Sequence, residues 1–248
     1  MHNPLFSGES AASRLIAHRG YALQAPQNSL PAFRRAGQLG FWAIETDVHR
    51  TEDGLLVCCH NARVDTMFSG TGAIREQSWQ TLQRLTIRPE KANGYPEPCR
   101  MPLFREYLQI CREYGAFPFI ETKTADIAQV VETAAEYFRE EEIILSSSNL
   151  AHLEALRKIT DKVFIHHIFS DETSAHRLAE LGNAGLSYNY PDWTTFPPEL
   201  ANKTHSLGLK LCLRAGDTPQ AIAGMTALGL DYIPTNRSVP EKKRNFSL

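Results

Sequence analysis

The sequence lacks four motifs that accompany common enzyme chemistries. It contains no G-x-x-x-x-G-K-[ST] loop for nucleotide phosphates and no G-x-G-x-x-G at the start of a helix. A G-x-S-x-G turn, which would carry a nucleophilic serine, is also absent, as is the zinc-binding pattern H-E-x-x-H. Nucleotide hydrolysis, hydride transfer and serine acyl chemistry therefore lose their usual sequence support.

An excess of basic residues is missing too. The chain has 26 Lys and Arg against 28 Asp and Glu, which gives a formal net charge of −2. We therefore expect no nucleic-acid partner, because such partners require a basic surface. A small anionic substrate remains compatible with this charge, since a bound metal would supply positive charge locally.

Disulfide-type cysteine spacing and long apolar runs are absent as well. The chain has five cysteines and no C-x-x-C pair, and Cys58 and Cys59 are adjacent in an apolar run, where buried thiols are expected. This pattern favours a reducing compartment. Residues 1–14 hold no apolar core of signal-peptide length, and no apolar run approaches transmembrane length. We therefore expect a cytoplasmic protein with no transmembrane segment.

Short apolar runs alternate with longer segments of helical periodicity. The predicted strands are 15–18, 43–48, 55–60, 117–122, 143–146, 163–169, 186–190, 210–213 and 232–235. The predicted helices are 29–39, 103–114, 127–138, 150–159, 173–181, 198–206 and 219–228. Such alternation predicts parallel strands joined by crossover helices. For 248 residues it favours one α/β domain, 1–248, folded as a (β/α)₈ TIM barrel, with an open doubly wound sheet as the alternative.

The interval from about 61 to 100 breaks this rhythm. It is rich in glycine, proline and polar residues, and only 78–85 shows a short helical pattern. The interval follows the predicted strand that ends at His60. We interpret it as a small insertion that covers one end of the barrel.

Acidic residues cluster on two of the predicted strands. Because side chains alternate along a strand, Glu45 and Asp47 share one face, and Glu121 and Lys123 share one face of a later strand. Carboxylates this close repel one another unless a cation or a proton lies between them. The three carboxylates therefore predict an oxygen-liganded site for one divalent ion, Mg²⁺ or Ca²⁺. The alternative is that they point outward or pair with Arg and Lys.

Two histidines end predicted strands. His18 closes the first strand and His60 closes the run 55–59, where barrel enzymes place their active sites. Together with the strand-end carboxylates they predict acid–base catalysis. The adjacent His166 and His167 are expected to face opposite ways, and His49 lies nearest the acidic cluster by pattern. The remaining histidines are expected to be structural: His2, His152, His176 and His205.

Several motifs follow one another in order along the chain: L-I-A-H-R-G at 15–20, P-Q-N-S at 26–29, I-E-T-D-V at 44–48, T-E-D-G at 51–54, V-C-C-H at 57–60, M-P-L at 101–103, I-E-T-K at 120–123 and, more weakly, G-L-D-Y-I-P-T-N at 229–236. Together they resemble the glycerophosphodiester phosphodiesterase family, whose members are phosphatidylinositol-phospholipase-C-like phosphodiesterases. The H-R-G triplet alone would be a weak signal. Five of these motifs lie at predicted strand ends, and their occurrence in this order makes the signal specific.

The resemblance implies metal-dependent hydrolysis of glycerophosphodiesters, which releases an alcohol and glycerol 3-phosphate. It also implies a (β/α)₈ barrel with an insertion where 61–100 lies. The roles that it implies for individual residues fall into three groups. They are metal binding by Glu45, Asp47 and Glu121, proton exchange by His18 and His60, and contact with the phosphate by Arg19 and Lys123.

The chain departs from the family pattern at four places. Gln27, Asn61 and Asn236 stand where the family usually has carboxylates, and the segment 213–215 replaces a Trp-Thr-Val segment that commonly packs over the glycerol. Because the proposed metal ligands and both histidines remain, we expect an active enzyme with an altered substrate preference. The alternative is a catalytically weakened barrel that binds a phosphorylated metabolite without turnover.

A lyase that uses Lys123 as a Schiff-base nucleophile is a further alternative. Such a lysine needs a lowered pKa, but Glu121 on the same face would raise the pKa of Lys123. The sequence therefore disfavours this alternative.

Overall fold

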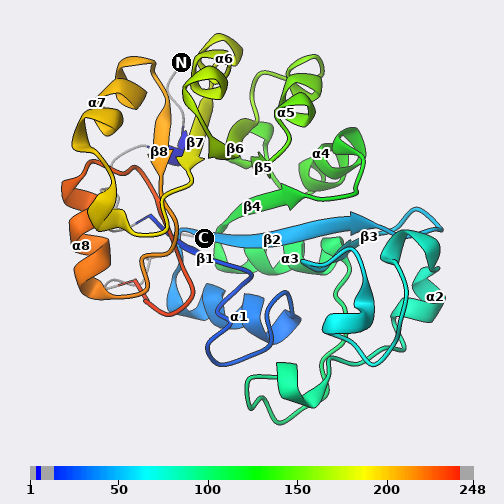
Figure 1. The fold of residues 1–248 in the computed structure, drawn as a ribbon. Helices are drawn as coiled ribbons and strands as arrows, with labels where there is room; N and C mark the ends of the chain where they lie inside the picture. The colour runs from blue at the N-terminus through cyan, green and yellow to red at the C-terminus, as the bar shows by residue number, and fades with distance from the viewer. Residues whose placement is uncertain (1–3, 7–13, 241–248) are drawn as a thin grey trace.

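The computed structural model describes residues 4–6 and 14–240. His2 and most of the N-terminal stretch considered above lie outside these residues. Within the described ranges, strands and helices alternate along the chain and the helices surround the strands (Figure 1). No helix in these ranges has both the length and the apolar character needed to cross a membrane.

Eight parallel strands form a nearly closed barrel in the order β8-β7-β6-β5-β4-β2-β1-β9. Their bounds are β1 Leu15–Ala17, β2 Ala43–Arg50, β4 Phe117–Thr122, β5 Ile144–Ser147, β6 Phe164–Ser170, β7 Ala184–Tyr188, β8 Lys210–Cys212 and β9 Ile233–Thr235. Two hydrogen bonds join the edges: Asp231 N donates to Leu211 O at 2.8 Å, and Gly216 N donates to Pro234 O at 2.8 Å. The expected barrel is confirmed, and the open sheet is not observed among the described residues.

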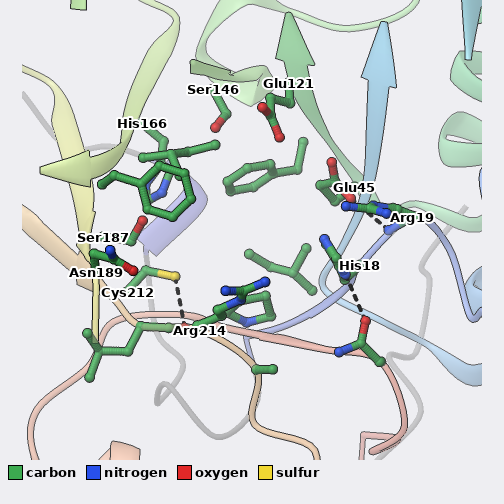
Figure 2. Close-up of a pocket in the computed structure, with 18 of the residues that line it drawn as sticks. His18, Arg19, Glu45, Glu121, Ser146, His166, Ser187, Asn189, Cys212 and Arg214 are labelled. Carbon is green, nitrogen blue, oxygen red and sulfur yellow. Dashed lines mark hydrogen bonds between the residues drawn. The ribbon is translucent and has the colours of Figure 1, made fainter. Parts of the chain in front are cut away.

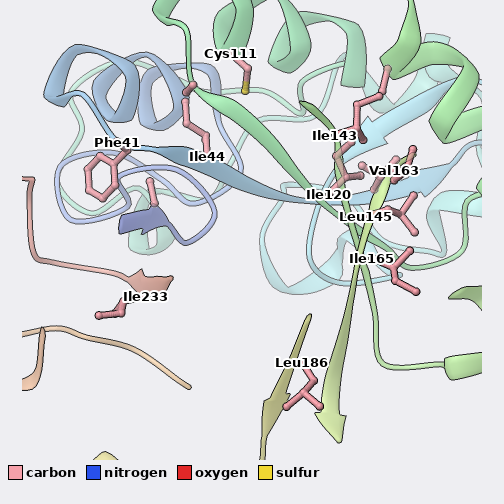
Figure 3. Close-up of a cluster of buried hydrophobic side chains, with 14 of the residues drawn as sticks. Phe41, Ile44, Cys111, Ile120, Ile143, Leu145, Val163, Ile165, Leu186 and Ile233 are labelled. Carbon is pink, nitrogen blue, oxygen red and sulfur yellow. The ribbon is translucent and has the colours of Figure 1, made fainter. Parts of the chain in front are cut away.

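The helices cover the outside of the barrel. Their bounds are α1 Leu30–Leu39, α2 Trp79–Leu82, α3 Phe104–Tyr114, α4 Ile127–Ala135, α5 Leu150–Arg157, α6 Glu172–Leu181, α7 Pro198–Ser206 and α8 Pro219–Ala227. Strand side chains such as Ile44, Ile120 and Leu145 are fully buried in the layer between strands and helices (Figure 3). Because side chains alternate along a strand, their neighbours in sequence point into the barrel. This alternation directs Glu45 and Glu121 inward.

The predicted strand 55–60 forms in shortened form, but the expectation that it belongs to the barrel was wrong. β3 (Leu56–Cys58) runs antiparallel to β2, with Val57 opposite His49. A tight turn at Gly54, whose φ is +86°, reverses the chain between the two strands. An apolar run after such a turn fits a hairpin as well as a barrel strand, so the sequence pattern did not separate them. The hairpin still returns His60 to the barrel mouth, because Cys59 N donates to Asp47 O at 3.0 Å.

The insertion forms a small structure beside the barrel. It contains α2 and three short 3₁₀ helices, Val64–Thr66, Ile74–Glu76 and Pro89–Lys91. A separate apolar cluster that includes Ile74 and Leu82 holds it together. It packs against the segment between β1 and α1, where Asn93 Nδ2 donates to Ala22 O at 2.6 Å. No residue of 61–100 belongs to the lining of the large cavity described below.

Candidate active site

A cavity of about 470 Å³ lies at the carboxyl ends of the strands. All eight parallel strands, or the residues directly after them, contribute to its lining. This is the end of a barrel where catalytic side chains gather. Six of the seven predicted site residues line it: His18, Arg19, Glu45, His60, Glu121 and Lys123. Asp47 is fully buried and contacts two of these residues, Arg19 and Lys123.

Strands β2 and β4 bring three carboxylates together at one side of the cavity, and Figure 2 shows two of them, Glu45 and Glu121. The two strands pair in parallel, with Asp47 opposite Glu121, and Glu45 lies two residues earlier on the same face of β2. One carboxylate oxygen from each of Glu45, Asp47 and Glu121 lies within 4.8 Å of the others. The strand alternation therefore does bring the three carboxylates together.

Two cations contact this cluster. Arg19 N donates to Glu45 Oε2 at 2.7 Å, and Arg19 Nε lies 3.5 Å from Asp47 Oδ2. Lys123 Nζ lies 3.2 Å from Asp47 Oδ1 and also contacts Glu121. The alternative of pairing with Arg and Lys is thus partly realised. The same two cations line the cavity and remain available to an anion placed there.

The electrostatic balance of the cluster is uneven. Burial, followed by the charges of Asp47 and Glu121, raises the pKa of Glu45 well above its ordinary value. Burial, followed by Asp47, also raises the pKa of Glu121. Burial alone would raise the pKa of Asp47, but Lys123 and Arg19 help to bring it below its ordinary value. Without a further cation, the cluster therefore favours the protonated form of Glu45 over a third negative charge.

The donor set fits a divalent metal ion. Asp47 Oδ1 is buried and accepts no hydrogen bond within the described part of the chain; its ionic contact is with Lys123. Such an oxygen has capacity for a metal ion. Three carboxylates form the oxygen-rich environment that Mg²⁺ and Ca²⁺ prefer. Glu45, Asp47 and Glu121 are thus able to hold the predicted ion.

A buried asparagine supports the acidic strand from the neighbouring loop. Asn28 Nδ2 donates to Asp47 Oδ2 at 2.8 Å, and Asn28 Oδ1 accepts from Thr46 Oγ1 at 2.8 Å. Asn28 has a φ of +50°, a left-handed conformation that asparagine adopts more readily than most residues. The P-Q-N-S motif therefore has a structural reason: it orients Asp47.

Each predicted catalytic histidine lies beside an asparagine. His18 Nδ1 is 2.7 Å from Asn236 Oδ1, and His60 Nδ1 is 2.7 Å from Asn61 Oδ1. Burial, followed by the charge of Arg19, lowers the pKa of His18. Both histidine rings line the cavity.

Other histidines near the mouth have partners of their own. His49 is buried, and its Nδ1 lies 2.8 Å from Thr124 Oγ1, outside the cavity lining. His166 lines the cavity, whereas His167 does not and pairs with Ser170 Oγ at 2.7 Å. The prediction that the two adjacent rings face opposite ways is therefore confirmed.

The sequence reasoning missed cavity residues from the later strands. Ser146, His166, Ser187 and Asn189 line the wall opposite His18 in Figure 2, and Arg214 extends into the cavity from the loop after β8. Arg214 has no hydrogen bond or ion pair with the rest of the described chain. Its only sequence signal was its position within the unusual 213–215 segment.

A parallel α/β barrel whose mouth combines three carboxylates, two cations and two histidines defines an enzyme class that acts on anionic substrates. The particular family follows from comparison with known proteins. The family model described as "Glycerophosphoryl diester phosphodiesterase family" matches residues 18–239, and the chain belongs to that family. The enzyme class expected from the sequence motifs is confirmed.

Known relatives match most or part of the chain. A glycerophosphodiester phosphodiesterase of Caldanaerobacter subterraneus is 26% identical over 90% of this chain and 93% of that protein. A human glycerophosphodiester phosphodiesterase 1 is 31% identical, but the match spans 44% of this chain and a third (33%) of the human protein.

Solved structures share the fold. An Oleispira antarctica phosphodiesterase, solved in complex with the product sn-glycerol-3-phosphate, superposes with a TM-score of 0.80 at 24% identity and covers 92% of this chain and 96% of that one. A glycerophosphodiester phosphodiesterase from Agrobacterium tumefaciens gives a TM-score of 0.75 at 21% identity, over 90% and 96% of the two chains. At these identities the likeness concerns the barrel architecture.

Proposed function

We propose that the protein hydrolyses glycerophosphodiesters to an alcohol and glycerol 3-phosphate, with a divalent ion held by Glu45, Asp47 and Glu121. The observation that carries this proposal is the convergence of the three carboxylate oxygens within 4.8 Å of one another, in a cavity that His18 and His60 also line. Membership of the family and the glycerol phosphate bound to the Oleispira relative support the choice of substrate class. The ion, Mg²⁺ or Ca²⁺, and the cytoplasmic location stay predictions.

The metal ion, when bound, would neutralise the phosphodiester charge and stabilise the negative charge that grows on the phosphoryl oxygens. Arg19 and Lys123 line the same cavity and donate hydrogen bonds to these oxygens. Arg214 reaches the cavity from the opposite strands and is the third cation that faces the substrate. Charge-assisted hydrogen bonds of this kind hold the substrate in one orientation.

The two histidines move the protons. One imidazole nitrogen takes the proton of the attacking hydroxyl while its oxygen forms the new bond to phosphorus. The bond from phosphorus to the alcohol oxygen breaks, and the other histidine gives that oxygen a proton. The attacking hydroxyl belongs either to water or to the substrate's own glycerol, in which case water opens the resulting cyclic phosphate. Both routes require His18 and His60 on the same cavity.

The decisive experiment measures glycerol 3-phosphate released from glycerophosphocholine and glycerophosphoglycerol with Mg²⁺, Ca²⁺ or Mn²⁺. His18→Ala and His60→Ala should each lower kcat by about 10²- to 10⁴-fold, the usual contribution of a general acid or base. His176→Ala on the exposed face of α6 is the matched control and should keep full activity. Near-normal turnover by either active-site variant would refute its role.

The same assay separates an enzyme from a binding protein. A barrel that binds a phosphorylated metabolite without turnover would show a raised melting temperature with these substrates, but it would release no alcohol. The hydrogen-bonded placement of both histidines favours turnover, because binding alone does not require two oriented imidazoles.

A further inference from the structure

The loop between β8 and α8 carries a carboxylate that contacts the end of β9. Asp217 Oδ1 accepts from Asn236 N at 2.6 Å and from Thr235 Oγ1 at 3.1 Å. Asp217 Oδ2 accepts from Asn236 Nδ2 at 3.0 Å. An ionised carboxylate can only accept hydrogen bonds. The amide of Asn236 must therefore turn its NH₂ group toward Asp217 and its oxygen away.

The orientation of the Asn236 amide determines which nitrogen of His18 carries a proton. Asn236 Oδ1 lies 2.7 Å from His18 Nδ1 (dashed line in Figure 2), and an amide oxygen also only accepts. Nδ1 of His18 must therefore carry a proton. The backbone holds the same alignment, since His18 N donates to Thr235 O at 3.1 Å. The end of β9 thus holds both the backbone and the ring of His18, and the other ring nitrogen, Nε2, is left for the cavity.

We propose that Asp217 and Asn236 are positioning residues that keep His18 in the Nδ1–H form and present Nε2 as its reacting nitrogen. This proposal rests on the proposed function, in which His18 transfers a proton. Nδ1 keeps its hydrogen before and after that transfer, because an amide oxygen does not take up a proton at neutral pH. The chain from Asp217 to His18 therefore orients the ring and leaves proton exchange to Nε2.

The isosteric variant Asp217→Asn tests the orientation directly. It offers an NH₂ group as well as an oxygen to Asn236, so the Asn236 amide is free to flip and to turn its own NH₂ group toward His18. We expect kcat to fall by between about tenfold and 10⁴-fold, the upper limit being the effect of a wrong histidine tautomer on proton transfer. KM should change by less than about threefold, because the interaction acts in the reaction step rather than in binding.

A double variant provides the rescue. Asp217→Asn combined with Asn236→Asp moves the carboxylate next to His18, where it accepts from Nδ1, and the new amide at 217 donates to it. The side-chain bond between positions 217 and 236 is reversed, but the hydrogen bond that His18 Nδ1 donates to position 236 keeps its direction, and most of the lost kcat should return. Asn236→Asp alone places two carboxylates against each other and should itself lower kcat. Asp171→Asn, at the start of α6 and outside the cavity, is the control and should leave kcat unchanged.

Nitrogen-15 NMR of the histidine rings gives a readout that needs no activity. In the unmodified protein at neutral pH, His18 should show a protonated Nδ1 and a free Nε2, and Asp217→Asn should mix the two tautomers. A protonated Nε2 in neutral His18 would overturn the proposal even if the enzyme is active. Normal kcat in Asp217→Asn, or no rescue in a folded double variant, would also overturn it. Absence of any hydrolysis would contradict the proposed function, while the tautomer would still be measured.

Discussion

Addition of Mg²⁺ or Ca²⁺ to the metal-free protein should raise its melting temperature. When all three are ionised, Glu45, Asp47 and Glu121 carry three negative charges against two positive charges on Arg19 and Lys123, so a net local charge of −1 attracts the ion. At an ion concentration of 100 times Kd, binding to the folded state contributes about 2.7 kcal/mol. For a chain of this size that corresponds to a rise of about 5–11 °C, measurable by calorimetry.

The response to pH is a second part of this prediction. Burial and the neighbouring carboxylates raise the pKa of Glu45, so the metal must displace a proton from it. The apparent affinity should therefore fall as the pH is lowered, and calorimetric titration in buffers of different ionisation enthalpy should detect proton release. An affinity that does not change between pH 8 and about pH 5 would contradict the assignment of Glu45 as a ligand.

Matched variants decide whether the three carboxylates are responsible. Glu45→Gln should abolish the stabilisation by the metal, because it removes a charge from the cluster and keeps the shape of the side chain. Glu141→Gln, in the acidic surface segment Glu140–Glu142, should leave the stabilisation unchanged. Equal temperature shifts in both variants would refute the metal site, since the effect would then arise from nonspecific ion binding.

Three further predictions concern other parts of the chain. Arg214→Gln should raise KM by about tenfold and change kcat little, because it removes a charge-assisted contact to the substrate; an unchanged KM in a steady-state assay contradicts that role. Burial lowers the pKa of His166 to about 3, against 6.5 for an exposed histidine in the unfolded chain. Protonation therefore favours the unfolded chain as the pH falls below 6.5, and the free energy of unfolding should be lower by about 3 kcal/mol at pH 4. His166→Gln should reduce this loss in urea unfolding; an identical pH dependence contradicts it. Ile74→Ala should destabilise the insertion by about 2–5 kcal/mol, and a change below about 1 kcal/mol would argue against its small core.

The barrel was predictable because each crossover unit is encoded locally. The strand that begins at Phe117 and the helix α4 after it show their own periodicities, and repetition of such units leaves few possible folds. The direction of β3 was not predictable in the same way. A hairpin and a barrel strand have the same apolar pattern, and pairing with β2 decides between them. Strand direction depends on contacts that a sequence pattern does not contain.

The same distinction applies to the site. Glu45 and Asp47 were found because both lie on one strand, two residues apart. Asp217 and Thr218 both precede α8 and either could cap it, but only Thr218 does so, by accepting from Ala221 N at 3.1 Å. The carboxylate of Asp217 instead binds Asn236, 19 positions away in the chain. Residues whose partners come from another strand end cannot be assigned before the strands are placed.

Gln27, Asn61 and Asn236 stand where the family resemblance implies carboxylates. Their contacts favour an active enzyme over one that has lost its catalytic activity. Gln27 Oε1 accepts from Arg19 Nη1 at 2.7 Å, and the oxygens of Asn61 and Asn236 lie at the same distance from the two histidine rings. Each amide keeps the acceptor that a carboxylate would supply and removes its charge. The acceptors beside Arg19 and the two histidines are therefore retained, while the surroundings of the cavity become less negative. Because orientation serves turnover and charge serves substrate choice, we expect these substitutions to alter which phosphodiester binds more than whether it is cleaved.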